Sequence, residues 1–179
     1  MKLRKGSQDA TGLTVGIVAS KFNKFVTSRL LTECVKALTK AGASDEAIEV
    51  VRVPGAFEIP LVARQLARSG RFDAVICLGA VIRGDTPHFE YISTEVSRGI
   101  LQASMESNLP VIFGVLTTDT VAQAIERADP AKLNRGADAA KTAIEMVNVM
   151  RQLKKEESED VPPGPAPRRA GRTAARAKR

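Results

Sequence analysis

The sequence predicts a single α/β domain, a three-layer sandwich in which a four-stranded parallel sheet is flanked by helices on both faces. Four short apolar segments rich in β-branched residues are each followed by a loop and then by apolar residues at helical spacing. Strands that are apolar on both faces are typical of parallel sheets. Strands that alternate with helices are joined by right-handed crossovers. The 179 residues, 44% of them hydrophobic, suffice for one core and a tail.

The first two strand–helix units follow this plan. Leu13–Ser20 is the first predicted strand, and the helix after it ends near Gly42, because glycine accepts the left-handed conformation that closes many helices. Ile48–Val53 is the second predicted strand. Pro54 ends it, because proline lacks the N–H group that a neighbouring strand needs. Pro60 suits the first turn of the second helix.

The third unit contains the only histidine of the chain, His88, in a polar loop directly after a buried strand. Ala74–Ile82 is long, apolar and β-branched, and the next helix is expected over about Phe89–Ser107. In open parallel sheets, ligands bind beyond the carboxyl ends of the strands, where helix N-termini leave N–H groups unpaired. The loop around His88 is therefore the first candidate for chemistry.

The fourth unit and a final helix complete the domain. The fourth strand is predicted at Val111–Thr117, with Asp119 as the cap of a helix over Val121–Ala128. A last amphipathic helix is expected from near Gly136 to Leu153. Four strand-end loops should then face the same edge of the sheet.

We expect three parts: an N-terminal arm (1–12), one folded domain (13–153) and a disordered basic tail (154–179). The tail lacks apolar periodicity and combines clustered prolines with an Arg/Ala-rich end. The formal charge is +7; residues 161–179 hold six Lys or Arg and no Asp or Glu, which leaves 7 − 6 = +1 for the rest. Nucleic-acid binding is therefore not expected, except weakly through the tail.

The remaining composition favours a cytoplasmic protein without a metal site. No segment approaches the ~18 apolar residues of a membrane span, and MKLRKGSQDA lacks the apolar core of a signal peptide. Cys34 falls in a helical pattern and Cys77 in the third strand, where burial as small apolar residues is the simplest interpretation. A lone histidine and two scattered cysteines do not make a metal site.

The polar candidates each have two interpretations. His88 could be a general acid or base, because imidazole titrates near neutral pH, or a solvated loop residue. The N–H groups of Asp85 and Thr86 and the Thr86 hydroxyl could cradle a phosphate, or form an ordinary turn. In a phosphate cradle, the Asp85 carboxylate would turn away or meet a cation. Arg127 and Arg135 could each grip a phosphate with paired donors, or face solvent.

Three phenylalanines and a glutamate complete the candidates. Phe22 and Phe57 lie in strand-end loops, where a ring either covers the edge of the core or stacks on a planar ligand. Phe113 lies inside the fourth strand, where core packing is the simpler interpretation. Glu58 suits the first turn of a helix. The residues alone predict an α/β domain that binds a small, phosphorylated and partly planar ligand beside one histidine.

Several motifs, taken in order, resemble the 6,7-dimethyl-8-ribityllumazine synthase family. They are LTVGIVASKFN, VPGAFEIP, GAVIRGDTPHFEYISTEVSRGI, FGVLTTDT, and AIERA followed by NRG and AIEM. The resemblance implies a flavodoxin-like fold and a transferase of riboflavin biosynthesis. The implied reaction condenses 5-amino-6-(D-ribitylamino)uracil with 3,4-dihydroxy-2-butanone 4-phosphate to 6,7-dimethyl-8-ribityllumazine, the penultimate step, without a metal or organic cofactor.

The resemblance also implies a role for each candidate. His88 would be the proton-transfer residue, and Phe113, Arg127 and Arg135 would reach the site from a neighbouring subunit. The pyrimidine and ribityl contacts would be Phe22, Ala56, Phe57, Glu58, Ala80, Val81, Ile82 and Phe113. The phosphate contacts would be Asp85, Thr86, Arg127 and Arg135.

One segment departs from the family pattern. Members commonly have Gly-Thr-Lys-x-Gly-Asn-Lys-Gly after the position of Ala128, whereas this chain has DPAKLNRG over residues 129–136. Arg135 stands where lysine is usual, and the two side chains are not equivalent. Members restricted to pentamers or pentamer pairs often carry an insertion in this loop, and none is evident here.

The resemblance implies a homo-oligomer, with a pentamer as its unit and a 60-subunit icosahedral shell permitted. Riboflavin synthase is a candidate partner, and residues 1–10 are expected to add a strand to a neighbour's sheet. A different class of function stays open beside the enzyme: a non-catalytic flavin- or lumazine-binding shell protein of the same fold.

Overall fold

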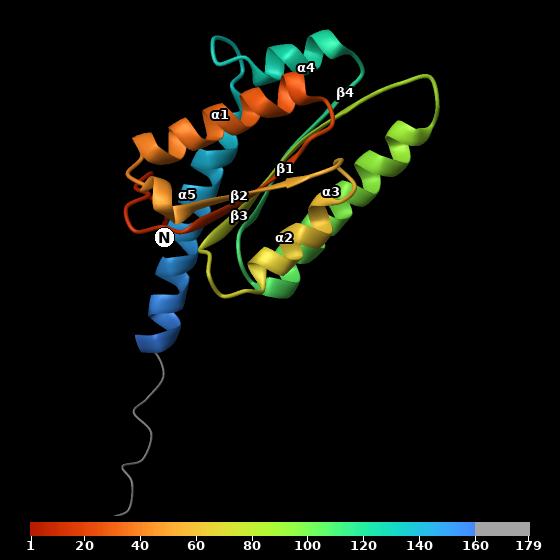
Figure 1. Ribbon diagram of the computed structural model, residues 1–179. Helices are drawn as coiled ribbons and strands as arrows, with labels where there is room; N and C mark the ends of the chain where they lie inside the picture. The colour runs from red at the N-terminus through yellow and green to blue at the C-terminus, as the bar shows by residue number, and fades with distance from the viewer. Residues whose placement is uncertain (160–179) are drawn as a thin grey trace, which may run out of the picture.

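The computed structural model describes residues 1–159 and confirms the predicted α/β sandwich (Figure 1). Four strands alternate with helices along the chain, and each predicted strand is present. The elements are β1 (Val15–Ser20), α1 (Lys24–Lys40), a short 3-10 helix η1 (Asp45–Ala47), β2 (Ile48–Val53), α2 (Ile59–Ala67), β3 (Ala74–Ile82), α3 (His88–Ser107), β4 (Val111–Thr118), α4 (Val121–Ala128) and α5 (Arg135–Glu159).

The four strands form one parallel sheet in the order β2-β1-β3-β4. β1 and β3 occupy the centre, so both pair on two sides, and their apolar side chains are buried on both faces. The chain passes from β1 to β2 on one side and then to β3 on the other. The sheet therefore has its topological switch point between β1 and β3, where the loops at the carboxyl ends diverge and leave a crevice.

Helices cover both faces of the sheet (Figure 1). One core joins α1, α4 and α5 to the sheet through side chains such as Ile17, Leu30 and Ile144. The other joins α2 and α3 to the opposite face through side chains such as Ile59 and Ile100. Both cores are almost wholly aliphatic, as expected for a sequence with 4% aromatic residues. Within the described residues, none of the helices is long and apolar enough to span a bilayer.

Both cysteines are buried, as predicted. Cys34 of α1 and Cys77 of β3 are free thiols with no exposed surface. Burial raises the pKa of Cys34 to about 12 and also raises the pKa of Cys77, because an apolar surrounding disfavours the thiolate. These side chains act as apolar packing residues.

Helices α1 and α5 approach each other at a glycine. A Cβ built on Gly136, the second residue of α5, would overlap the carbonyl oxygen of Leu30 in α1. No larger residue fits there without moving one helix. The backbone contact therefore fixes the start of α5, including the adjacent Arg135, against α1.

The N-terminal arm lies along α5 of the same chain. The Asn148 side-chain amide donates to the carbonyl oxygens of Ser7 (3.2 Å) and Asp9 (3.1 Å), and Gln152 donates to that of Lys5 (2.9 Å). Among the described residues the arm contains no strand. The expected strand addition to a neighbouring subunit involves a second chain and stays a prediction.

Two predicted boundaries are wrong. Thr120, not Asp119, caps α4: its hydroxyl accepts a hydrogen bond from the Gln123 N–H (3.2 Å). Helix α5 does not end at Leu153 but continues to Glu159, because the charged segment after Leu153 contains lysines and glutamates, which are good helix formers. The rest of the predicted disordered tail lies outside the described residues.

Candidate active site

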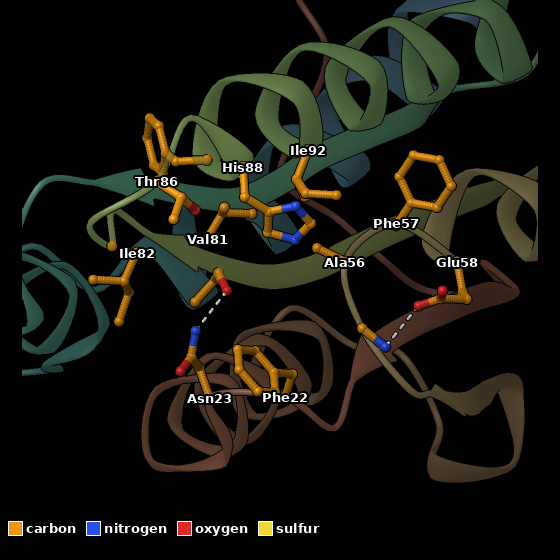
Figure 2. Close-up of a pocket in the computed structure, with 14 residues that line it drawn as sticks. Phe22, Asn23, Ala56, Phe57, Glu58, Val81, Ile82, Thr86, His88 and Ile92 are labelled. Atoms are coloured by element: carbon orange, nitrogen blue, oxygen red, sulfur yellow. Dashed lines mark hydrogen bonds between the residues drawn. The ribbon is translucent and has the colours of Figure 1, made fainter.

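A cavity of about 630 Å³ lies at the carboxyl edge of the sheet, at the switch point (Figure 2). We call it the His88 pocket. Its size is typical of a site for a small molecule. Three strand-end loops and the start of α3 surround it. The lining residues are Phe22, Asn23, Gly55, Ala56, Phe57, Glu58, Ala80, Val81, Ile82, Gly84, Thr86, His88, Phe89 and Ile92.

The loop after β1 brings Phe22 to the pocket. Phe22 is 70% exposed, which is unusual for an aromatic residue in a folded domain and makes its ring accessible to a planar ligand. The next residue, Asn23, has a left-handed backbone (φ 53°), and its side-chain amide donates to the carbonyl oxygen of Ala80 (2.9 Å). This hydrogen bond, drawn in Figure 2, ties the Phe22 loop to the end of β3.

The loop after β2 supplies Ala56, Phe57 and Glu58. Phe57 is 57% exposed and lines the same pocket as Phe22. The Glu58 carboxylate accepts a hydrogen bond from the Gly55 N–H (2.8 Å), which closes the turn before α2 and leaves its second oxygen available (Figure 2). An acceptor and an aromatic face thus stand on the same short segment.

The end of β3 forms the floor of the pocket, and the loop after it forms one wall. Ala80, Val81 and Ile82 all line the cavity, and His88 begins α3 with its imidazole directed into the space beside Val81 and Ile92 (Figure 2). Thr86 lines the pocket too. Asp85 is exposed and is not among the lining residues.

Sequence reasoning missed an ion-pair cluster beside this loop, the Arg83 cluster of Arg83, Phe89, Glu90 and Asp119. The Arg83 Nε donates to Asp119 (2.7 Å) and its Nη1 to Glu90, and its guanidinium carbon lies 4.2 Å from the centre of the Phe89 ring. The hydrogen bonds that Arg83 donates to Asp119 and Glu90 raise its pKa. The alternating positive and negative residues around the loop are the only sequence signal of this cluster.

Phe113, Arg127 and Arg135 line a second cavity of about 530 Å³, the Arg127 cavity, on the side of β4, α4 and α5. Phe113 is 45% exposed, so the simpler interpretation as a core residue is wrong. Arg135 pairs with Asp138 (3.1 Å). Arg127 donates to the carbonyl oxygen of Gln123 (3.4 Å), and no carboxylate in residues 1–159 pairs with it.

Apart from Asp85, which lines neither cavity, the predicted site residues therefore separate into two groups on one subunit. No residue of the Arg127 cavity lines the His88 pocket, and within the described chain no lysine or arginine lines the His88 pocket. In the described part of the chain, no three His, Cys, Asp or Glu side chains gather in a group that could hold a metal ion.

An α/β sandwich with an apolar, partly aromatic pocket at its switch point and a histidine at the rim defines a class: proteins that bind small planar ligands at the strand ends of a parallel sheet. Residues 12–151 match the model of the family described as 6,7-dimethyl-8-ribityllumazine synthase. The chain is also 60% identical over 149 residues to the 6,7-dimethyl-8-ribityllumazine synthase of Syntrophus aciditrophicus (strain SB), which covers 83% of this chain and 97% of that protein. The chain belongs to the 6,7-dimethyl-8-ribityllumazine synthase family.

Proposed function

We propose that this protein is a transferase that condenses 5-amino-6-(D-ribitylamino)uracil with 3,4-dihydroxy-2-butanone 4-phosphate to form 6,7-dimethyl-8-ribityllumazine. Family membership carries the proposal, and the geometry of the His88 pocket supports it. The pocket is large enough for a substituted pyrimidine, and it offers aromatic faces, backbone groups and one titratable imidazole.

The pyrimidine half of the pocket follows from its lining. Phe22 presents an exposed ring for stacking, and Ala80, Val81 and Ile82 present a strand end with backbone groups that a flat heterocycle can reach. Ala56, Phe57 and Glu58 lie across the opening, where the Glu58 carboxylate can accept hydrogen bonds from ribityl hydroxyls. A planar ring and a polyol chain thus have separate contacts.

The other half of the pocket suits the phosphorylated ketone. Thr86 precedes the N-terminus of α3, where unpaired N–H groups and the helix dipole favour an anion. We assign Asp85 to this subsite through its backbone N–H alone, because its exposed carboxylate would repel a phosphate. The absence of a lysine or arginine from the described pocket lining leaves the phosphate charge to be met from elsewhere.

We assign proton transfer to His88. The 5-amino group of the pyrimidine forms a Schiff base with the ketone and releases water, phosphate is eliminated, and ring closure by the ribitylamino nitrogen on the second carbonyl releases another water. Protons move at each of these steps. A histidine titrates near neutral pH, so it can take up a proton and return it. Figure 2 shows the His88 imidazole directed into the pocket beside Val81 and Ile92, and we expect both substrates to meet there. Holding the two substrates together supplies a further part of the rate.

We propose that the site is completed by a neighbouring subunit, which contributes Phe113, Arg127 and Arg135. The support is the separation of the two cavities and the lack, within residues 1–159, of a carboxylate paired with Arg127, whose guanidinium could bind the phosphate with two donors. A pentamer places such half-sites next to one another around a ring. A 60-subunit icosahedral shell is compatible with the short loop over residues 129–134, and riboflavin synthase is a candidate partner.

The proposal includes a cytoplasmic location. Its support is that Cys34 and Cys77 are free thiols, the state that a reducing compartment maintains.

The rival function, a binding protein without turnover, is not favoured. The relative from Syntrophus aciditrophicus, which is 60% identical and matched over 97% of its length, carries the enzyme's name. His88, Thr86 and Arg127 are all present in this chain. A protein that only binds the ligand has no need of an acid–base group beside a phosphate subsite.

The direct test is incubation of the purified protein with both substrates, with lumazine formation followed by its absorbance. We expect turnover well above the slow uncatalysed condensation, and a His88→Ala variant with a much lower kcat and an unchanged assembly size. Binding of both substrates without lumazine formation would favour the binding-protein alternative. Dissociation of the His88→Ala oligomer would show a structural role for His88 instead.

A further inference from the structure

We infer that Arg83 is a positioning residue of this site: it fixes the loop of residues 84–87, and with it the start of α3, by bridging that loop to the turn that precedes α4. The substrate effects below rest on the proposed function. The structural part, the fixing of the loop, is independent of it.

Arg83 contacts both sides of the loop that it begins. It is the first residue after β3, and its backbone N–H donates to the carbonyl oxygen of Thr118 (2.9 Å), which continues the pairing of β3 with β4. Its side chain crosses to the first turn of α3, where it bonds Glu90, seven residues further along, and covers the ring of Phe89. The loop that carries Thr86 is thus held at both ends by one residue.

The same guanidinium also reaches a second loop. Its Nε donates to Asp119 (2.7 Å), at the turn between β4 and α4. Helix α4 carries Arg127, which lines the other cavity. The Arg83 cluster therefore connects the part of the subunit that holds His88 with the helix that holds Arg127.

Only arginine can make this set of contacts. Its planar group directs donors in fixed directions toward two carboxylates while its flat face stacks on an aromatic ring. A lysine has one ammonium and cannot do all three. Arg83 does not line the His88 pocket itself, so its effect on substrates would act through the loop and not by direct contact.

Arg71 provides a matched control at the opposite end of β3. It pairs with Glu49 (2.6 Å) and lies 4.7 Å from the centre of the neighbouring Phe72 ring, so it repeats the chemistry of Arg83 away from the site. Replacing either arginine by methionine removes one exposed cation that stacks on an aromatic ring and pairs with carboxylates, two at Arg83 and one at Arg71. Only the Arg83 change should alter the site.

The experiment compares the Arg83→Met, Arg83→Lys, Asp119→Asn and Arg71→Met variants of the full chain. We expect Arg83→Met to speed backbone hydrogen exchange in residues 84–90 and to raise KM for the ketone phosphate about tenfold, because misplaced groups weaken catalysis steeply. KM for the pyrimidine should change less than about twofold. Asp119→Asn should give a smaller effect in the same direction, and Arg71→Met none.

Three results would overturn the inference. The first is wild-type exchange in Arg83→Met over residues 84–90. The second is an equal effect of Arg71→Met, which would show a general loss of stability. The third is full rescue by Arg83→Lys, which would assign the effect to positive charge alone. If the wild-type protein forms no lumazine, the proposed function fails, while the exchange comparison still decides whether Arg83 fixes the loop.

Discussion

The His88 pocket and the Arg127 cavity lie on the same subunit but are lined by different chemical groups. The pocket is lined by exposed aromatic rings, strand-end backbone and a histidine, and among its described lining residues no side chain carries a fixed positive charge. The cavity contains two arginines and an exposed phenylalanine, and no histidine lines it. Under the proposal that the site is shared between subunits, neither cavity alone is sufficient for the condensation. An isolated subunit should then be inactive, and subunit association would be part of the chemistry.

Mixing experiments test this division most strongly. His88→Ala and Arg127→Ala oligomers should each be nearly inactive. When they are dissociated, mixed in equal amounts and reassembled, about a quarter of wild-type activity should return, because a random mixture makes one shared site in four from two unaltered halves. The measurement is turnover before and after reassembly.

A control for this experiment mixes each variant with itself under the same conditions, which should restore nothing. If the mixed oligomers stay as inactive as their parents although assembly is complete, then both residues serve the same subunit's site, and the division into two half-sites is wrong.

Substitution of Arg127 should affect the use of only one of the two substrates. Arg127→Ala should lower kcat/KM for the ketone phosphate about 100-fold, the value of a lost charged hydrogen-bond pair, while pyrimidine binding changes little. Steady-state kinetics with each substrate varied in turn would measure this. Arg135→Ala should have a smaller effect, because Arg135 is already paired with Asp138. Equal loss for both substrates would contradict a phosphate role.

The structure of the His88 pocket can be tested at Asn23, an uncharged residue that lines it. Asn23→Gly keeps the left-handed backbone but removes the hydrogen bond to Ala80, which should cost about 1 kcal/mol. Asn23→Ala loses the same bond and adds the strain of a left-handed backbone, about 1 kcal/mol more. Thermal unfolding should thus rank wild type, glycine, then alanine. An alanine variant as stable as the glycine variant would show that backbone strain is negligible there.

The smallest effect concerns the opposite end of the sheet. Burial alone would raise the pKa of Asp73, but hydrogen bonds from Thr14 and Arg151 outweigh it, so the pKa is lowered. A lowered carboxyl pKa contributes stability above the unfolded-state pKa of about 4, and this is lost as pH falls through the folded value. Asp73→Asn should therefore cost about 1 kcal/mol at pH 7, a low value because the group is partly exposed.

Unfolding by denaturant at pH 7 and at about pH 3 would measure this difference, which should shrink in acid. Substrate KM should not change in Asp73→Asn, which separates this structural group from the site residues. A stability loss that is the same at both pH values would assign it to packing instead of charge.

The sequence predicted the sheet because local signals there agree with the final fold. Each strand is a short β-branched segment, as at Ile48–Val53 before Pro54. The bounds of β2 and β3 match the prediction, whereas β1 begins at Val15 instead of Leu13 and β4 ends at Thr118 instead of Thr117. Boundaries set by single hydrogen bonds were less predictable: Asp119 looked like a cap, yet Arg83 engages its carboxylate, and Thr120 caps α4. The extension of α5 past Leu153 was missed because a charged segment suits both helix and disorder.

The candidate site shows the same limit. Motif matches located the strand-end residues, including Phe22 and His88, because a parallel sheet brings its carboxyl ends together. Asn23 could have been noticed, since asparagine tolerates a left-handed backbone before a helix. The Arg83 cluster depends on side chains that meet only after folding, and pairs such as Arg83 and Asp119 are 36 positions apart. No local sequence pattern predicts such contacts.

The backbone contact at Gly136 has a consequence for how this protein can vary over evolution. Because the carbonyl oxygen of Leu30 occupies the space where any side chain would begin, only glycine is accommodated while α1 and α5 keep their distance. In a library of random variants, position 136 should tolerate fewer substitutions than the adjacent Arg135, although only the latter lines a cavity. At position 136, sequence change is then limited by how closely two helices pack and not by contact with a ligand.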